Sequence, residues 1–246
     1  MSKKDLKTSE YVASVVYRMP KGHVFTYTDF IGDVNKKEAV IKALNRMVAS
    51  GKIAKLSKGK YYKPEKTVFG ELQPDQYQVV KDLLEDDGKI IGYLTGYSIY
   101  NKLGLTTQVS NTIQIGRKDT RPKFERGRYT ISFVKQKNNI TKENIPLLQI
   151  LDAIRYIKKV PDTTTEAATL RLKTIINELS DKDIANTVRL AQKYPPSTRA
   201  LLGAILEEID QTSLTAHLKE SLNPMTQYEV RGVKKVLPTA ENWNFK

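Results

Sequence analysis

The chain has 246 residues, no cysteine and a formal net charge of +14. The lack of cysteine excludes disulfides and thiolate metal sites, and it favours a reducing compartment. No apolar run is long enough for a membrane helix and the first residues lack the apolar segment of a signal peptide, so we expect a cytoplasmic protein without membrane contact.

The positive charge is concentrated toward the start of the chain. Residues 1–68 carry a balance of +9, residues 69–160 carry +5, and residues 161–246 are neutral. Such a gradient favours contact with a polyanion, whereas a basic solvated surface is the plainer interpretation.

The first elements follow a recognisable order. Residues 8–18 show helical spacing of apolar side chains with Thr8 or Ser9 as the cap, and residues 23–25 form a short extended piece. Thr26 and Asp29 have the spacing of a capping box, which predicts a short helix over residues 27–31.

The stretch from Asn35 to Pro64 completes this pattern. It predicts a helix capped by Asn35 and closed by Gly51, with an apolar side and a polar side. A lysine-rich β-hairpin follows, over residues 52–62. Helix, strand, helix, helix and hairpin are the order of a winged helix-turn-helix, so we predict a DNA-binding domain over residues 1–66.

Such a domain reads DNA with its last helix and grips the backbone with its hairpin. Lysines at the helix start and at the hairpin tip suit phosphate contacts. Asn45 matches the edge of adenine, and Arg46 or Lys42 matches guanine. Winged helices also dock proteins, and exposed cations are often only solvated. The candidate DNA-binding residues are Lys36, Lys37, Lys42, Asn45, Arg46, Lys58 and Lys60.

We expect residues 67–246 to form a second, larger domain, and the whole chain to be a mixed α/β (α+β) protein. After a linker over residues 64–73 and a helix over 75–84, Thr95 caps a short helix. Two strands, over residues 111–115 and 128–134, belong to a small antiparallel part that ends near residue 140. The rest is predicted to be helical, over residues 145–159, 164–179 behind a Thr163–Glu166 capping box, 183–192, from 197, and 213–221, with an apolar tail docked on the body.

Between the two predicted strands lies a strongly basic segment, residues 116–128. It is either a second nucleic-acid or partner contact or a solvated hairpin loop. Its cations are Arg117, Lys118, Arg121, Lys123, Arg126 and Arg128.

The sequence shows no constellation of an enzyme. His23 and His217 have no metal-ligand spacing, and glycine-rich phosphate loops and nucleophile turns are absent. Scattered carboxylates, for which no spacing favours a shared site, leave a metal-dependent nuclease as a minor alternative; they include Glu71, Asp75, Glu166 and Asp181. We therefore expect neither catalytic residues nor a cofactor nor a bound metal.

Two segments resemble a known family, the AbiEi-like antitoxins of type IV toxin–antitoxin (abortive infection) systems. They read EAVIKALNRMVASGKIAKLSKGKYYKP and GYLTGYSIYNKLGLTTQVSNTIQI, and the resemblance covers residues 8–135. Family members open their second domain with Tyr-x-[Ser/Thr]-Gly-x-Ser-Ala and then Gly-Leu-Thr, and here Ile99 replaces the alanine. The matching residues are Tyr93, Thr95, Gly96, Tyr97, Ser98, Gly104, Leu105 and Thr106.

The resemblance implies a DNA-binding autorepressor that acts on its own promoter and counters a nucleotidyltransferase-type toxin, by direct contact or without it. Two other hypotheses remain open. One is a stand-alone winged-helix regulator whose C-terminal domain binds a protein or a ligand, and the other is a metal-dependent DNA-processing enzyme.

Overall fold

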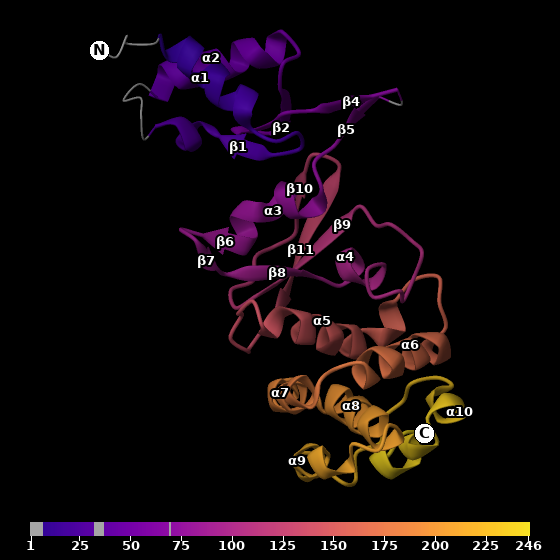
Figure 1. Cartoon of the computed structure of the whole chain (residues 1–246). Coiled ribbons are helices and arrows are strands. Elements are labelled where there is room, and N and C mark those ends of the chain that lie inside the picture. Colours follow the sequence, from indigo (N-terminus) through magenta and orange to yellow (C-terminus); the bar gives the residue numbers. More distant parts are fainter. Residues whose placement is uncertain (1–6, 32–36, 69) are drawn as a thin grey trace. The chain divides into compact units, whose positions relative to one another are not determined.

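The computed structural model describes residues 7–31, 37–68 and 70–246 (Figure 1). The chain divides into two compact units. Unit 1 comprises residues 1–81 and 125–128, and unit 2 comprises residues 82–124 and 129–246. The predicted boundary near residue 66 falls within unit 1.

Unit 1 contains the predicted winged-helix order. Helix α1 (Thr8–Arg18) is followed by strand β1 (Val24–Thr26), the 3-10 helix η1 (Tyr27–Phe30), helix α2 (Lys37–Ala49) and the hairpin of β2 (Ala54–Ser57) and β3 (Lys60–Tyr62). The sheet order is β1-β3-β2 and both pairs are antiparallel, so residues 23–25 do pair with the hairpin.

A small apolar core holds unit 1 together. It contains Val12 and Val16 of α1, Val40 and Leu44 of α2, and Phe25 of β1, all buried. Burying side chains of this size stabilises by about 1.5–3 kcal/mol each before conformational entropy is counted. The packing fixes which side of α2 faces inward and therefore which side faces solvent.

The predicted caps and turns of unit 1 are confirmed in part. The Thr26–Asp29 capping box is present, and Gly51 has the left-handed φ of +66° expected after α2. Helix α1 has Lys7 at its N-cap with no side-chain hydrogen bond, so the cap predicted at Thr8 or Ser9 was wrong. The predicted linker contains a two-stranded ladder, β4 (Glu65–Thr67) and β5 (Gly70–Leu72).

Helix α3 (Gln76–Leu84) and the short hairpin of β6 (Glu85–Asp86) and β7 (Lys89–Ile90) lead into a four-stranded sheet. Its order is β10-β11-β9-β8, with β8 (Gly92–Thr95), β9 (Thr112–Arg117), β10 (Phe124–Arg126) and β11 (Tyr129–Lys135). Strands β8 and β9 are antiparallel, whereas β9 and β11 are parallel, so the sheet is mixed rather than antiparallel as predicted. The reason is that residues 118–128 cross over and include β10 instead of forming one hairpin loop.

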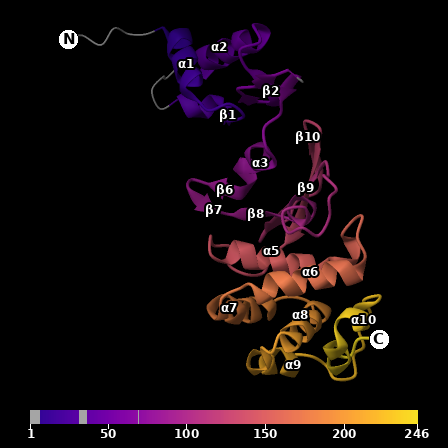
Figure 2. The same ribbon diagram turned by 45° about the vertical axis from the view of Figure 1, so that its right-hand side comes forward.

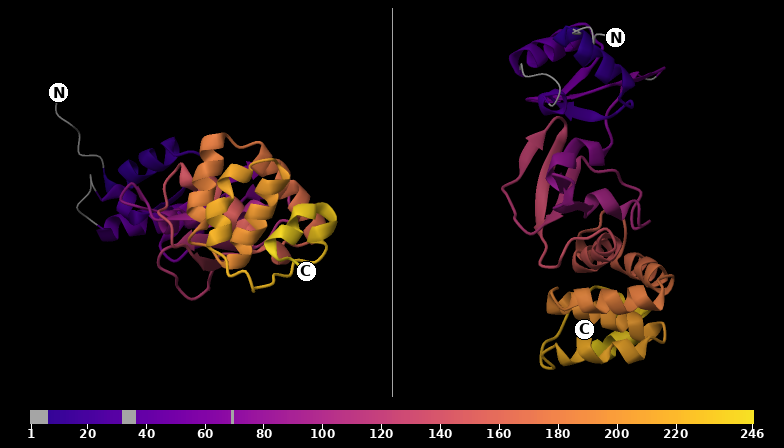
Figure 3. Two further views of the ribbon diagram at one scale, coloured as in Figure 1. Left: turned by 90° about the horizontal axis from the view of Figure 1, so that it is seen from below. Right: turned by 60° about the vertical axis from the view of Figure 1, so that its left-hand side comes forward.

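The helical part of unit 2 packs against this sheet in layers. Figures 1 and 2 show α5 (Asn144–Arg155) next to the sheet, with α6 (Thr165–Asn177) beside α5, and α7 (Asp181–Ala191) and α8 (Pro196–Glu208) beyond them. The remaining short helices are α4 (Tyr97–Tyr100), η2 (Ile157–Lys159), η3 (Thr212–Leu214), α9 (Ala216–Glu220), α10 (Val233–Val236) and η4 (Pro238–Trp243). In the view from below, the C-terminal segment lies beside α8 (Figure 3).

The apolar tail docks on the body of unit 2, as predicted. Val233, Leu237 and Trp243 are buried in the same core as α5 and α8. The Trp243 ring lies against Gly203 of α8, where a Cβ atom would collide with it, and its Nε1 donates to Glu207 Oε2 at 2.7 Å.

Two helix caps in unit 2 differ from the prediction. Helix α6 is capped by Thr164, whose Oγ1 accepts from the Ala167 amide, and not by Thr163. Thr95 lies in β8 rather than capping α4, and its hydroxyl donates to a buried carboxylate, Asp152.

Candidate nucleic-acid interface

Helix α2 presents a polar face on the side opposite its buried residues. Lys42, Asn45 and Arg46 are all exposed there, and Lys37 is exposed at the first residue of the helix. Val40, Ala43 and Leu44 point into the core. The structure therefore brings three of the predicted residues, Lys42, Asn45 and Arg46, onto one exposed helix face, and Lys36 lies outside the described residues.

Lys37 at the start of α2 contacts an aromatic ring. Its Nζ lies 4.9 Å from the centroid of Tyr27 in η1. A cation over an aromatic face gains about 0.5–1 kcal/mol at an exposed site. The contact biases the ammonium group toward the junction of η1 and α2, and the sequence analysis did not anticipate it.

Asn45 is held by the hairpin behind it. The hydroxyl of Tyr61 in β3 donates to Asn45 Oδ1 at 3.1 Å, and the Tyr61 ring stacks on Phe25 with centroids 6.3 Å apart. An amide oxygen has two lone pairs, so Asn45 can still accept from one donor while its Nδ2 donates to another. Tyr61 orients the side chain without removing the pairing that adenine requires.

The hairpin places its lysines at and near its tip. Gly59 has a φ of +74°, as the tight turn between Ser57 and Lys60 requires. Lys58 is exposed and Lys60 is half-buried. Two further exposed lysines lie in the same region and were not among the predicted residues, Lys52 before β2 and Lys55 within it. Their signal was the alternation of the strand, which directs Lys55 away from the buried Leu56.

The basic segment 116–128 does not form one patch. Arg126 is 8% exposed and its Nη1 donates to Val79 O at 2.9 Å, within unit 1. Arg117 donates to Leu83 O at 3.3 Å, and Lys118 donates to Asn139 Oδ1 at 3.1 Å, both within unit 2. The other three cations, Arg121, Lys123 and Arg128, are exposed. Three of the six predicted contact residues, Arg117, Lys118 and Arg126, therefore have hydrogen bonds inside the fold.

Within the described ranges, no three or more His, Asp or Glu side chains lie together as a metal site would require. None of the helices in the described part of the chain combines the length and apolar character needed to cross a bilayer.

The chain was also compared with known proteins. Residues 11–184, more than half of the chain, match the model of a family described as "Family of unknown function (DUF6088)". No curated protein matches the chain.

One solved structure is similar in fold. It is described as "Crystal structure of RV2827C protein from Mycobacterium tuberculosis", with a TM-score of 0.59, 13% sequence identity, and coverage of 92% of this chain and 85% of that chain. At that identity the likeness concerns the fold alone, and it supports the mixed α/β architecture with a C-terminal helical region. Since the family match extends over most of both units, the chain belongs to the DUF6088 family of unknown function.

Proposed function

We propose that the chain is a DNA-binding transcriptional autorepressor and the antitoxin of a bacterial type IV toxin–antitoxin pair. The observation that carries the DNA-binding part is the exposed face of α2, with two cations and a hydrogen-bonding amide, next to a lysine-bearing hairpin. The antitoxin part rests on the resemblance of residues 8–135 to AbiEi-like antitoxins. The DNA is the protein's own promoter, and the functional partner is a nucleotidyltransferase-type toxin.

In the proposed complex α2 lies in the major groove of duplex DNA. Asn45 accepts from adenine N6 and donates to N7, and Arg46 or Lys42 donates to the O6 and N7 acceptors of guanine. Lys58 and Lys60 of the hairpin contact phosphates on one side of the groove. Lys37 lies at the helix N-terminus, where backbone N–H groups also favour a phosphate.

The hairpin lysines give the first test. The double variant Lys58→Ala/Lys60→Ala should bind every duplex more weakly, and the slope of log K against log salt concentration should decrease by about 2, because each phosphate contact contributes about 0.9 to that slope. Fluorescence anisotropy with a labelled promoter duplex between about 50 and 200 mM salt measures both quantities.

The matched control for this test is Lys142→Ala/Lys182→Ala. Both lysines are exposed in unit 2, so the variant loses the same charge at a distance along the chain from the hairpin. Its salt slope should equal that of the wild type. A hairpin variant with an unchanged slope, or a control with an equal decrease, would refute the phosphate role.

Asn45 gives a test of sequence reading. Asn45→Ala should lose discrimination at a single base pair, worth about 1–3 kcal/mol, and leave preferences elsewhere unchanged. A set of duplexes that each differ at one base pair measures this. Tyr61→Phe, which keeps Asn45 but removes its hydrogen-bond donor, should weaken the same preference to a smaller extent. Uniform weakening across the set would show that Asn45 does not read bases.

The antitoxin part is tested in cells. Expression of the chain together with a nucleotidyltransferase encoded beside it should restore growth that the nucleotidyltransferase alone inhibits. Failure to restore growth, with promoter binding intact, would leave a stand-alone winged-helix regulator as the remaining function.

A further inference from the structure

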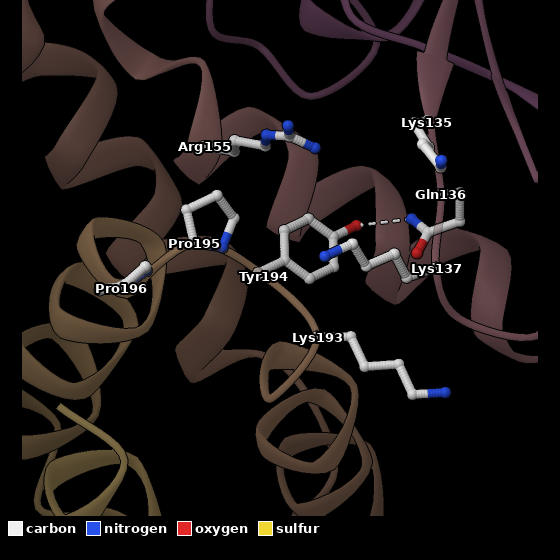
Figure 4. Close-up of a pocket in the computed structure, with 8 residues that line it drawn as sticks. All are labelled: Lys135, Gln136, Lys137, Arg155, Lys193, Tyr194, Pro195 and Pro196. Atoms are coloured by element: carbon white, nitrogen blue, oxygen red, sulfur yellow. Dashed lines mark hydrogen bonds between the residues drawn. The ribbon is translucent and has the colours of Figure 1, made fainter.

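Unit 2 contains a cavity of about 290 Å³ whose lining is strongly basic. Three segments meet there, the end of β11 and the residues after it, the end of α5, and the loop that joins α7 to α8 (Figure 4). We call it the basic cavity, and its lining residues are Lys135, Gln136, Lys137, Arg155, Lys193, Tyr194, Pro195 and Pro196.

The charge of this lining is the main observation. Four of the eight lining residues are cations and none of them is a carboxylate. Lys135, Lys137 and Lys193 are exposed, Arg155 is half-buried, and none of the three lysines has an ion-pair partner among the described residues. Like charges around one cavity repel each other, so an anion bound between them would be favoured.

The floor of the cavity is fixed by a buried hydrogen-bond network. Gln136 Nε2 donates to the hydroxyls of Tyr194 and Tyr93, each at 2.8 Å. Tyr194 donates to Asp152 Oδ1 at 2.9 Å, and Tyr93 donates to Asp152 Oδ2 at 2.7 Å. Gln136 Oε1 accepts from the Asn138 amide at 2.8 Å. Gln136 and Tyr194, the two lining residues that form the floor, are therefore held in place before any ligand binds.

The rim is also rigid on one side. Pro195 and Pro196 restrict the backbone where the chain enters α8. The Arg155 guanidinium packs over the Tyr156 ring, 5.0 Å from its centroid. In Figure 4 the Arg155 side chain extends from α5 toward the segment that carries Lys135 and Lys137.

We propose that the basic cavity binds a small molecule that carries two or more phosphate groups. An arginine fork and flexible lysines are the side chains that recognise phosphate oxygens. The four cations give the lining a charge of about +4, and no lining carboxylate offsets it. A phosphate group carries a charge of about −1.5 to −2 at pH 7, so two such groups neutralise the cavity better than one.

The size of the cavity agrees with this class of ligand. A volume of about 290 Å³ lies at the lower end of small-molecule sites, which suits a pyrophosphate or a nucleotide rather than a folded partner. The inference concerns unit 2 and does not depend on the DNA-binding role proposed for unit 1. A phosphorylated small molecule that binds there could act as an effector of the protein.

The test is calorimetric titration of the full-length chain with pyrophosphate, with inorganic phosphate and sulfate as weaker comparison anions. Pyrophosphate should bind at least tenfold more tightly than either. Lys137→Gln/Arg155→Gln should weaken pyrophosphate binding at least tenfold, and Lys193→Gln, at an exposed loop position, should weaken it severalfold without risk to the fold. The fluorescence of the one tryptophan, Trp243, verifies that each variant is folded.

Lys142→Gln/Lys182→Gln removes two exposed charges elsewhere in unit 2 and should leave pyrophosphate binding unchanged. An equal loss in this control, or equal affinities for pyrophosphate and sulfate, would overturn the proposal. The proposal would also be overturned if a short single-stranded oligonucleotide bound more tightly than pyrophosphate and if this binding were lost in the Lys137→Gln/Arg155→Gln variant. The ligand of the basic cavity would then be a nucleic-acid backbone.

Discussion

Replacing Asp152 by leucine is expected to destabilise unit 2 by about 2–6 kcal/mol. The Asp152 carboxylate is 1% exposed and accepts hydrogen bonds from three hydroxyls, those of Tyr93, Thr95 and Tyr194. Burial and the neighbouring carboxylate raise the pKa of Tyr93 and Tyr194, so both remain donors at neutral pH. Leucine leaves these donors without their acceptor, and each buried donor without a partner costs about 1–3 kcal/mol.

One of the three hydroxyls has an alternative. Tyr194 also lies 3.3 Å from Leu148 O, so its proton can turn to that carbonyl. Only the hydroxyls of Tyr93 and Thr95 therefore lose their acceptor in the leucine variant, which corresponds to about 2–6 kcal/mol. Asparagine at position 152 uses the same alternative, because its oxygen accepts from Tyr93 and Thr95 while its Nδ2 donates to Tyr194. We expect Asp152→Asn to change stability by only about 1 kcal/mol.

The stability difference between the wild type and Asp152→Asn should depend on pH. Burial raises the pKa of the Asp152 carboxyl above its ordinary value of 3.8, although the hydroxyl hydrogen bonds and Arg155 act in the opposite direction. A carboxyl with a raised native pKa contributes its full stability below pH 3.8 and loses it as pH increases through the native pKa. The wild type should therefore lose stability relative to Asp152→Asn between pH 3.8 and that native value.

Urea unfolding followed by Trp243 fluorescence measures these differences, since Trp243 and the neighbours of Asp152 share one apolar core. Equal stability of the leucine variant and the wild type would mean that the network does not stabilise unit 2. If the wild type instead gained stability relative to the asparagine variant as pH increases, burial would not be the dominant influence on the pKa of Asp152.

Unit 1 shows what the sequence can predict. The capping box of Thr26 and Asp29, the apolar side of α2 and the turn at Gly51 each depend on residues within four positions of one another. Local hydrogen bonds and helical periodicity determine such features, so the order of elements and the exposed face of α2 could be derived before any coordinates. The cap of α6 shows the limit of this reasoning, because the spacing of a capping box favours Thr163 with Glu166, whereas the fold selects Thr164.

The basic cavity and its floor could not be predicted in the same way. Lys137, Arg155 and Lys193 are far apart in the chain and meet only because α5 packs between the sheet and the loop before α8. One feature of the sequence does indicate the buried carboxylate of the floor. Asp152 follows Leu148 by four residues, which places a carboxylate on the buried side of α5.

The parallel pairing of β9 and β11 was equally hidden. A sequence with two strand signals and a short basic segment between them favours a hairpin. The third strand, β10, has only three residues, and its one aromatic, Phe124, gives little strand signal. The direction of β11 depends on β10, so missing the short strand led to the wrong topology.

Reversing the charge of the α2 face should strongly weaken specific DNA binding. In Lys42→Glu/Arg46→Glu both cations that we assign to guanine recognition become acceptors facing an electronegative groove. Loss of the guanine contact, which either cation can make, is worth about 1–3 kcal/mol, so affinity for the promoter should decrease by about 5-fold to 150-fold from this contact, and the charge reversal adds to the loss. Glutamate is as good a helix former as lysine or arginine, so the helix itself is retained.

Anisotropy with the promoter duplex and with a scrambled duplex of the same length separates the two components of this effect. Removal of the guanine contact predicts that the ratio of the two affinities decreases, with the discrimination by Asn45 retained, whereas removal of general attraction alone predicts that their ratio is kept. Lys142→Glu/Lys182→Glu makes the same charge change in unit 2 and should keep the wild-type ratio. A ratio in the α2 variant that equals the wild-type ratio would mean that Lys42 and Arg46 do not recognise bases.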